Sequence, residues 1–340
     1  MIKEAIGRLI EGRSLNMGEA ASVMEEIMSG EATPAQFGAF VTALRLKGET
    51  VSEITGLART MRAKAVPVKT SGPVVDTCGT GGDGAGTFNI STAAAFVVAA
   101  AGLRVAKHGN RAMSSHCGSA DVLEALGVKI DLNAGQVAQC LEEVGIGFMF
   151  APLFHPAMKY TAAPRRELGI RTVFNILGPL TNPAAASAQM LGVADGSLVA
   201  KMAEVLKGLG CKHALVVHGE DGLDEITVSG ITRVCELKDG AITSYSIRPE
   251  DFGLDEAASD SLKGGSAEEN AALLRRILGG ALGPPRDAVV MNAAAALVAG
   301  DRVRTLKEGA ELAQQLIDGG QAGARLEHLI EFSRGLAQEG

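Results

Sequence analysis

A glycine-dense segment offers the clearest candidate chemistry in this chain. It reads GTGGDGAGT over Gly79 to Thr87, it follows the short β-rich run 74–77, and an alanine-rich run from about Ser91 to Ala101 comes after it. These flanks predict a strand before the loop and a helix after it. Loops of this kind let backbone N–H groups approach phosphate oxygens, and the helix N-terminus adds positive potential. The segment therefore predicts a phosphate-binding loop.

Two common nucleotide-binding motifs do not account for this loop. It contains the dinucleotide pattern GxGxxG, but no Asp or Glu stands between Asp83 and Asp121, where an acid should hold the ribose. The P-loop pattern fails because Thr87 stands where the phosphate-binding lysine belongs. A glycine loop without a ligand is the remaining alternative. Glycines are costly to order, so a ligand that orders them is favoured.

A second candidate segment reads KHGNRAMSS over residues 107–115 and follows the predicted strand 103–107. Open α/β sheets bind ligands at the carboxyl ends of their strands. Lys107 offers a compact positive charge, and Gly109 permits close approach of a phosphate. A solvated turn is the alternative for this segment alone, but its pairing with the glycine loop favours one phosphate-binding cleft. Hydroxyl donors follow at Ser114, Ser115 and Ser119.

Four acidic residues follow the predicted strand 214–218. Acidic loops are usually only solvated, which is the alternative here. Mg²⁺, however, prefers one or two carboxylates together with substrate phosphates and water. Acids beside two phosphate loops therefore indicate magnesium delivered with a polyphosphate. The four acids are Glu220, Asp221, Asp224 and Glu225.

A pair of arginines stands in the stretch Pro164-Arg165-Arg166, which predicts the opening of a helix. Arginines in a first turn oppose the helix dipole, so an anionic ligand or the neighbouring Glu167 should account for them. The segment 175–183 is dense in helix breakers and predicts a shaped loop near a hinge. His108 stands out by its place beside Lys107. The other histidines, predicted to be surface or packing residues, are His116, His155, His213, His218 and His328.

The composition disfavours nucleic-acid and membrane partners. The 340 residues carry a net charge of −7, aromatic residues make up 4%, and Trp is absent. The most apolar run, 93–101, is far below the ~20 residues of a membrane span. Five cysteines without a CxxC pair indicate a reducing compartment. We therefore expect a cytoplasmic protein with no disulfide framework and no zinc site.

The elements that must position these segments fall into two groups. Residues 1–70 predict a helical domain, with Thr33-Pro34 opening a helix over 35–46 and Ser52 capping another that runs to about residue 63. Residues 71–340 alternate strands with helices, which predicts a larger α/β domain with a doubly covered, mainly parallel sheet. The runs 233–237 and 242–246, joined by Lys238-Asp239-Gly240, predict an antiparallel hairpin.

Four stretches together resemble the anthranilate phosphoribosyltransferase family. They read DTCGTGGDGAGTFNISTAAAFVVAAAG, VAKHGNRAMSSHCGSADVLEALG, RRELGIRTVFNILGPLTNP and GLDEITVSG, in the family's order. The resemblance implies a small helical domain, completed by part of 165–185, and a larger α/β domain of the kind shared with nucleoside phosphorylases. It also implies hinge segments and a homodimer formed through the helical domain.

The resemblance further implies transfer of a phosphoribosyl group from 5-phosphoribosyl 1-pyrophosphate to anthranilate, with release of pyrophosphate, in tryptophan biosynthesis. Mg²⁺ is expected on Ser91, Asp224 and Glu225, and the catalytic residues are expected to be Lys107, Asp224 and Glu225. Anthranilate is expected at Gly79, His108, Asn110, Arg165 and Pro179. The phosphoribosyl donor is expected at Gly79, Gly82, Asp83, Thr87, Asn89, Ile90, Ser91, Thr92, Lys107, His108, Gly109, Asn110, Arg111, Ala112, Met113, Ser114, Ser115 and Ser119.

The chain departs from the usual family pattern at Ala112-Met113 and at His116-Cys117, so no side-chain role is assigned to His116 or Cys117. Two rival functions remain. A pyrimidine-nucleoside phosphorylase shares the architecture and a Lys/Gly/Ser phosphate loop, but leaves the acidic GLDE motif unexplained. A nucleic-acid-binding relative needs a basic surface, which the net charge of −7 disfavours.

Overall fold

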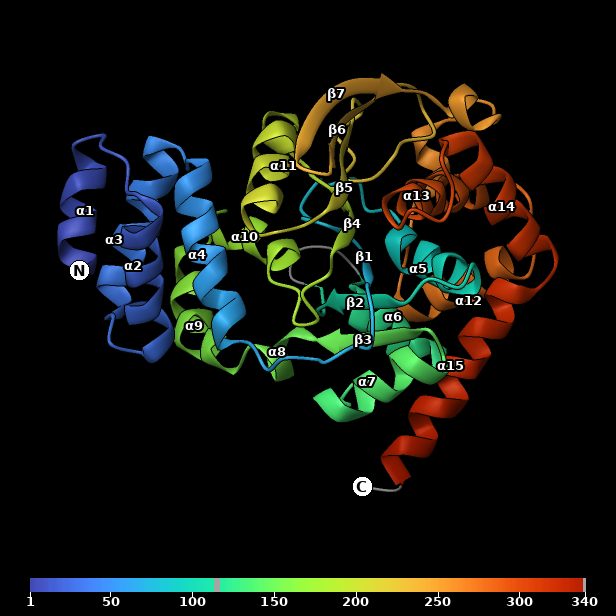
Figure 1. Cartoon of the computed structure of the whole chain (residues 1–340), viewed down its shortest axis with the longest axis horizontal. Helices are drawn as coiled ribbons and strands as arrows, with labels where there is room; N and C mark the ends of the chain where they lie inside the picture. Colours follow the sequence, from blue (N-terminus) through green and yellow to red (C-terminus); the bar gives the residue numbers. More distant parts are fainter. Residues whose placement is uncertain (113–116, 339–340) are drawn as a thin grey trace.

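The computed structural model describes residues 1–112 and 117–338. Helices α1–α4 gather at one end of the molecule, the sheet runs through the centre, and helices α12–α15 form the opposite end (Figure 1). The chain ends on α15, on the far side from the N-terminal helices. This arrangement confirms the prediction of a small helical domain beside a larger α/β domain.

The four N-terminal helices are α1 (Ile2–Ile10), α2 (Met17–Ser29), α3 (Pro34–Lys47) and α4 (Val51–Lys64). Capping boxes define where α2, α3 and α4 begin. Thr33 caps α3, with Pro34 at its first position, as predicted. The prediction for α4 was wrong by two residues, because Thr50 and not Ser52 accepts the hydrogen bond from the Glu53 N–H. Ser52 therefore lies inside the helix.

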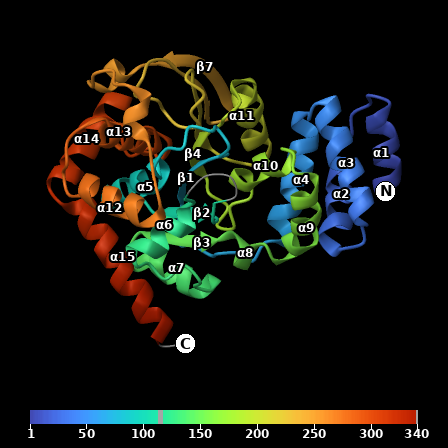
Figure 2. The same cartoon turned by 180° about the vertical axis from the view of Figure 1, so that it is seen from behind.

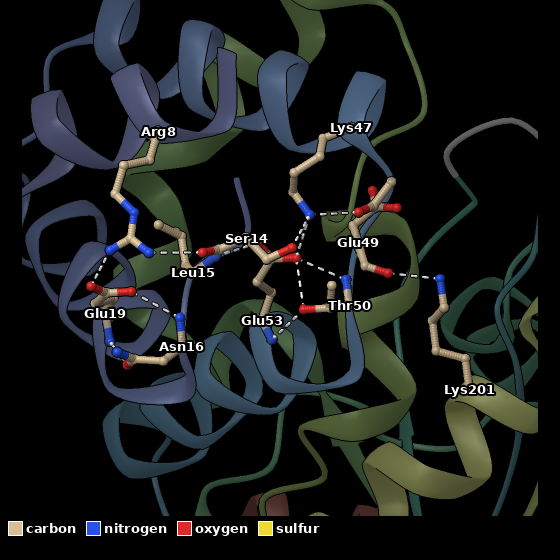
Figure 3. A network of polar contacts seen from close by, with 11 residues as sticks. Arg8, Ser14, Leu15, Asn16, Glu19, Lys47, Glu49, Thr50, Glu53 and Lys201 are labelled. Carbon is tan, nitrogen blue, oxygen red and sulfur yellow. Dashed lines mark hydrogen bonds and ion pairs between the residues drawn. The ribbon is translucent and has the colours of Figure 1, made fainter. Parts of the chain in front are cut away.

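Glu53 is the centre of a buried polar network that holds the turns between these helices (Figure 3). One carboxylate oxygen accepts a hydrogen bond from Leu15 N at 2.9 Å. The other accepts from Thr50 N at 2.8 Å and pairs with Lys47 Nζ at 2.9 Å. The α3–α4 turn is joined to the α/β domain by Lys201 Nζ, which donates to Glu49 O at 2.7 Å.

A segment from the middle of the chain packs on this bundle. It comprises α8 (Ala151–Phe154), α9 (Lys159–Leu168) and α10 (Phe174–Leu177), and α9 contacts both α2 and α3. The rings of Phe37 and Phe174 lie 5.2 Å apart. Figure 2 shows the same neighbourhood from behind, with α9 beside α2.

The predicted helix opening at Pro164-Arg165-Arg166 was wrong. Pro164 lies within α9, and Arg165 and Arg166 are in its last turn. Cations at a helix C-terminus are favoured by the dipole, so the electrostatic cost inferred from the sequence does not arise. A proline followed by charged residues is typical of a helix start. Pro164 differs from a proline at a helix start only because one turn of α9 precedes it.

The sheet has the strand order β3-β2-β1-β4-β5-β6-β7. Strands β1 to β5 run parallel, and β5, β6 and β7 pair antiparallel. Both the mainly parallel sheet and the β6–β7 hairpin are thus confirmed. The bounds are β1 Val75–Gly79, β2 Val105–Gly109, β3 Ile146–Phe150, β4 Ala188–Gly192, β5 His213–Gly219, β6 Thr232–Lys238 and β7 Ala241–Ile247.

Both faces of the sheet are covered, because alternate residues of its strands enter different cores. Leu215 and Val217 of β5 belong to the core that contains α5 and α13, whereas Ala214 and Val216 join the core that contains α11 and the N-terminal helices. The helical domain thus shares one apolar core with a face of the sheet.

The remaining helices flank the sheet. Within the described ranges, none of the helices combines the length and apolar character that a membrane crossing needs. The α-helices are α5 (Ile90–Ala100), α6 (Ser119–Leu126), α7 (Ala134–Glu143), α11 (Val199–Gly208), α12 (Ala267–Leu278), α13 (Pro284–Ala299), α14 (Leu306–Asp318) and α15 (Gln321–Gln338). The 3₁₀ turns are η1 (Pro156–Met158), η2 (Gly178–Leu180), η3 (Gly196–Leu198), η4 (Pro249–Phe252) and η5 (Ser259–Leu262).

Candidate active site

The predicted site segments leave the carboxyl ends of parallel strands at one edge of the sheet. The glycine loop follows β1, the KHGN segment ends β2, and the acidic loop follows β5. β1 and β4 are in register, so that Gly79 lies opposite Gly192. Carboxyl ends of parallel strands are the usual ligand-binding edge of open α/β sheets. The topology therefore brings the three segments together.

Asp224 from the acidic loop lies directly against the end of β1. Its Oδ2 accepts a hydrogen bond from Gly81 N at 2.6 Å. A Cβ on Gly79 would lie 2.2 Å from that oxygen, and a Cβ on Gly192 would lie 1.7 Å from Asp224 O. Glycine is thus required at both strand ends for the carboxylate to reach this place. The role of Gly192 was not predicted, because nothing in its neighbouring sequence reveals which residue it faces.

Glu225 lies beside the start of α5, next to Lys107. Its Oε1 accepts from Ser91 N at 3.2 Å, whereas its Oε2 is buried without a partner among the described residues. Lys107 Nζ donates to Thr77 O at 2.6 Å and lies 3.4 Å from Ser91 Oγ. The Lys107 side chain is almost fully buried. The expected metal residues and the expected catalytic lysine therefore form one cluster.

Burial shapes the electrostatics of this cluster. It raises the pKa of Glu225 to about 7, against the opposing effect of the Lys107 charge. It also raises the pKa of Asp224 well above its usual value, and the carboxylates of Glu225 and Asp83 add to that shift. Two acids that repel each other in a buried place favour a bound cation.

The arrangement fits a magnesium ion supplied with a substrate. The described residues contain no set of three His, Cys, Asp or Glu side chains placed to hold a metal by themselves. Asp224 and Glu225 offer two carboxylates, one with an unpartnered buried oxygen, and Ser91 Oγ lies nearby. Mg²⁺ commonly binds through one or two carboxylates and takes its other ligands from water and phosphate oxygens.

The acidic loop divides into two structural halves. Glu220 pairs with Arg233 on the exposed surface, with Arg233 Nη2 donating at 3.0 Å. Asp221 Oδ2 accepts from Thr227 Oγ1 and Ser229 Oγ, each at 2.7 Å, and so stabilises the loop itself. Only Asp224 and Glu225 therefore face the glycine loop and α5.

The KHGN segment is held mainly by α6. Asp121 Oδ2 accepts from Ala112 N and from Gly118 N, both at 2.9 Å, while Arg111 pairs with Asp121 and Glu124. The Arg111 guanidinium therefore already has partners on the protein. Met113, Ser114 and Ser115 lie outside the described residues, as does His116.

The start of α5 supplies the remaining donor-site candidates. Asn89 Nδ2 donates to Cys117 O, and Asn89 Oδ1 accepts from Asn270 Nδ2, both at 3.1 Å. Ile90 is part of the core, so only its backbone is available to a ligand. Thr92 Oγ1 is buried and has no partner in the described part of the chain. Thr87 forms an isolated bridge with Lys263.

The expected acceptor residues come from several elements, including α9, η2 and the end of β2. The Arg165 guanidinium lies 5.4 Å from the centre of the Phe174 ring, and burial lowers its pKa. Pro179 is buried in η2. Asn110, at the exposed end of the KHGN segment, accepts at its carbonyl from Ser119 Oγ at 3.4 Å.

His108 faces a second histidine. Its ring lies 5.0 Å from that of His155, and the ring nitrogens His108 Nε2, His155 Nδ1 and His155 Nε2 are buried without partners among the described residues. Burial lowers the pKa of His108 to about 3 and that of His155 to about 4. Both rings are therefore neutral at pH 7. The sequence predicted a surface or packing role for His155, and no motif reveals its pairing with His108.

Two polar residues between α9 and β4 were also missed. Arg171 donates to the carbonyl oxygens of Gly81 and Gly82, and Asn182 Nδ2 donates to Asp76 Oδ2 at 2.7 Å. Their partners lie about 90 and 106 residues away in the chain. Contacts at such separations have no local signature in a single sequence.

Comparison with known proteins places the whole chain in a well-characterised group. Residues 71–323 match the glycosyl transferase family α/β domain, and residues 3–65 match the helical bundle domain of that family. The chain is similar to anthranilate phosphoribosyltransferases from Dehalococcoides mccartyi (strain 195), at 59% identity over 99% of both chains, and from Moorella thermoacetica, at 57% identity over 98% of both chains.

Solved structures give the same result. The crystal structure of the Thermus thermophilus anthranilate phosphoribosyltransferase aligns with a TM-score of 0.92 at 48% identity, covering 97% of this chain and 99% of that one. The Saccharomyces cerevisiae enzyme in complex with PRPP and Mg aligns with a TM-score of 0.90 at 28% identity, over 98% of both chains. The yeast enzyme is also known in complex with 4-fluoroanthranilate.

Proposed function

This chain belongs to the anthranilate phosphoribosyltransferase family, and from that premise we propose that it transfers the phosphoribosyl group of 5-phosphoribosyl 1-pyrophosphate (PRPP) to the amine of anthranilate, in tryptophan biosynthesis. Pyrophosphate is the second product. The observation that carries the proposal is the placement of Asp224 and Glu225 against the glycine loop and Ser91.

The donor binds, in this proposal, at the edge formed by the ends of β1 and β2. The backbone of the glycine loop and the start of α5 face the pyrophosphate, together with the KHGN backbone and Ser119. Asp224, Glu225 and Ser91 hold Mg²⁺, which neutralises charge on the departing pyrophosphate when bound. The PRPP and Mg complex of the yeast relative supports both ligands. The rest of the expected donor set, including Gly82, Asp83 and Thr87, belongs to the same loop.

The reaction needs little base catalysis, because the amine on the aromatic ring of anthranilate is neutral at pH 7 and is already a nucleophile. Its nitrogen lone pair attacks the anomeric carbon of the ribose, the bond from that carbon to the pyrophosphate oxygen breaks, and the amine proton passes to solvent. Lys107 contributes positive charge beneath Ser91, where negative charge grows on the leaving group. Direct displacement inverts the anomeric carbon.

Anthranilate binds, we propose, on the side of Arg165, Asn110 and His108, with Pro179 lining the pocket and Gly79 at its boundary with the donor. A guanidinium that burial has partly desolvated binds a carboxylate strongly. The neutral ring of His108 adds a flat apolar surface without a competing charge. The complex of the yeast relative with 4-fluoroanthranilate supports anthranilate as the acceptor.

The direct test of the function follows the fluorescence of anthranilate in the presence of PRPP and Mg²⁺. We expect fluorescence to be lost only when both are present, with one pyrophosphate released for each anthranilate consumed. The rival phosphorylase function is tested in the same samples by adding a pyrimidine nucleoside and inorganic phosphate. Nucleoside cleavage without consumption of anthranilate would overturn the proposal.

We further propose that the protein is a homodimer formed through its helical domain. Ile10 at the end of α1 and Leu46 at the end of α3 are 73% and 84% exposed, and a second copy packed on this domain would remove their apolar surface from water. The family resemblance points to the same surface.

A cytoplasmic location is also proposed. All five cysteines are free and buried, which suits a reducing compartment. Cell fractionation with a periplasmic and a cytoplasmic marker protein checks the location, and recovery with the periplasmic marker would contradict it.

A further inference from the structure

Arg171 connects the acceptor segment to the glycine loop. It stands between α9 and α10, its side chain is exposed, and its guanidinium binds two consecutive carbonyl groups of the loop. Nη1 donates to Gly82 O at 2.6 Å and Nη2 donates to Gly81 O at 2.9 Å. A planar guanidinium with two parallel donors suits such a pair, whereas a lysine ammonium does not.

The contact fixes which way the peptide groups of the loop point. Gly81 is held on both sides, because its N–H donates to Asp224 and its carbonyl accepts from Arg171. Gly81 and Gly82 both have positive φ, of 70° and 76°, so the two residues form a left-handed turn. The carbonyl oxygens, which would repel a phosphate, are thereby bound to a cation.

The same turn leaves its N–H groups available. The backbone N–H groups of Gly82, Asp83 and Gly84 have no acceptor within the described part of the chain. Successive unpaired N–H groups in a left-handed turn form a typical anion-binding concavity. A Cβ on Gly82 would lie only 1.6 Å from Arg171 Nη1, so the glycine at this position is required by the contact itself.

We propose that Arg171 is a positioning residue for the donor: it holds the carbonyl groups of Gly81 and Gly82 so that the N–H groups of the glycine loop face the pyrophosphate of PRPP. The inference rests on the proposed function for the identity of the donor. Arg171 acts through the loop, and it contacts neither the reacting carbon nor the amine. Removing it therefore weakens donor binding while the acceptor site stays intact.

Arg171→Ala and Arg171→Lys test the role, and Arg276→Ala, which removes an exposed arginine from α12, controls for the change in net charge. We expect Arg171→Ala to raise the KM for PRPP about tenfold, because the N–H groups of the loop lose their fixed direction. The KM for anthranilate should stay within about twofold. Arg171→Lys should be intermediate, and Arg276→Ala should match the unaltered protein.

Two further readouts separate positioning from a merely structural role. The melting temperature of Arg171→Ala should be unchanged, because an exposed side chain adds little to global stability. Free guanidinium ion at millimolar concentration should restore part of the donor affinity, since the vacated place is open to solvent. An unchanged KM for PRPP, or a lowered melting temperature with equal loss of both substrates and no rescue, would overturn the proposal.

Calorimetric titration with PRPP and Mg²⁺ keeps this inference separate from the proposed function. If the unaltered protein binds PRPP but consumes no anthranilate, the transferase function fails, and the Arg171 variants still report on donor binding. If the unaltered protein turns over and Arg171→Ala binds PRPP equally well, the function stands and the role of Arg171 fails.

Discussion

At the scale of single residues, the site is defined by two adjacent acids with different partners. Asp224 is bound to the glycine loop through Gly81 N, and Glu225 to the start of α5 through Ser91 N. Each acid therefore holds one element of the proposed donor site in place. Burial raises the pKa of both acids, and repulsion from Glu225 adds to the shift at Asp224, so a bound cation would favour their charged forms.

The combined change Asp224→Asn and Glu225→Gln removes both negative charges while keeping shape and hydrogen-bonding atoms. We expect kcat/KM to fall at least about 10²- to 10³-fold, the usual loss when one electrostatic contact to the transition state is removed. The dependence of the rate on Mg²⁺ concentration should weaken as well. Steady-state kinetics across a magnesium titration provide the measurement.

Glu220→Gln is the matched control for this change, because Glu220 lies on the same loop but pairs with Arg233 at the surface. It should leave both the rate and the magnesium dependence unaltered. Unchanged magnesium dependence in the double variant would refute the assignment of Asp224 and Glu225.

The buried histidines make the stability of the protein depend on pH. His155 is 3% exposed, and burial lowers its pKa to about 4, whereas an unfolded histidine titrates near 6.5. Between these two values the unfolded chain binds more protons than the folded one, so stability rises with pH in this window. It is fully present above pH 6.5 and is lost as the pH falls towards 4.

His155→Leu should remove the share of this dependence that is due to His155. At pH 5 the contribution of one such histidine is about 2 kcal/mol, so the loss of stability between pH 7 and pH 5 should shrink by that amount in the variant. Urea unfolding at the two pH values measures the difference. His328→Leu removes an exposed histidine, so between pH 7 and pH 5 it should lose as much stability as the unaltered protein. If His155→Leu also lost as much as the unaltered protein over this range, the explanation would be contradicted.

At the scale of elements, polar groups at helix ends decide how the helical domain is built. Glu53 serves as the cap partner of α4, the partner of Lys47 and the acceptor for Leu15 N in the loop between α1 and α2 (Figure 3). Its side chain is completely buried and that of Lys47 is 7% exposed. Removing one partner of such a pair leaves the other buried and uncompensated.

Glu53→Ala should therefore destabilise the protein by about 3 kcal/mol. Glu11→Ala breaks the ion pair with Arg13, in which both side chains are 61% exposed, and should cost less than about 1 kcal/mol. Thermal unfolding of the two variants side by side gives the comparison. Equal melting temperatures for both would show that the buried network adds no more than a surface pair.

Elements with local signals were predictable from the sequence. Thr33-Pro34 predicted α3 because a cap and a proline act on the next turn, and Asp239-Gly240 predicted the β6–β7 hairpin because both residues have the positive φ of its turn. Pro164 misled the prediction for α9, since a proline inside a helix has the same neighbours as one at a helix start. Whether Pro164 starts the helix or lies within it depends on the tertiary packing of α9.

The candidate site divides in the same way. The sequence located the glycine loop, Lys107 and the pair Asp224–Glu225, because their residue types carry the chemistry. Residue types alone did not separate Asp224 and Glu225 from Glu220 and Asp221, and only the family resemblance singled out that pair. Arg171 was missed because its partners come from a strand end about 90 residues earlier.

At the scale of the whole molecule, the helical domain and the sheet are joined by a shared apolar core and by cations of α4. Arg59 donates to Gly208 O at 2.8 Å, and Arg62 donates to Leu180 O at 2.6 Å and to Leu209 O at 3.2 Å. The carbonyls at the end of α11 thus receive positive charge, which its dipole favours. α4 faces the sheet domain, and α1 and α3 remain outermost (Figure 1).

Leu46→Glu should convert the proposed dimer to a monomer, because a charge at the centre of an apolar contact must be desolvated without a partner. Light scattering coupled to size-exclusion chromatography measures the mass. Leu282→Glu changes a leucine of similar exposure, 81%, at the opposite end of the molecule and should leave the mass unaltered. A monomeric unaltered protein, or a dimeric Leu46→Glu variant, would contradict the proposed interface.

The most direct test of the proposed site is a crystal structure of the protein with PRPP and Mg²⁺. The pyrophosphate should lie within hydrogen-bonding distance of the Gly82–Gly84 N–H groups, with the metal on Asp224 and Glu225 and the ribose turned towards Arg165. A donor bound away from the carboxyl ends of β1 and β2, or a metal that leaves both acids untouched, would contradict the proposed site.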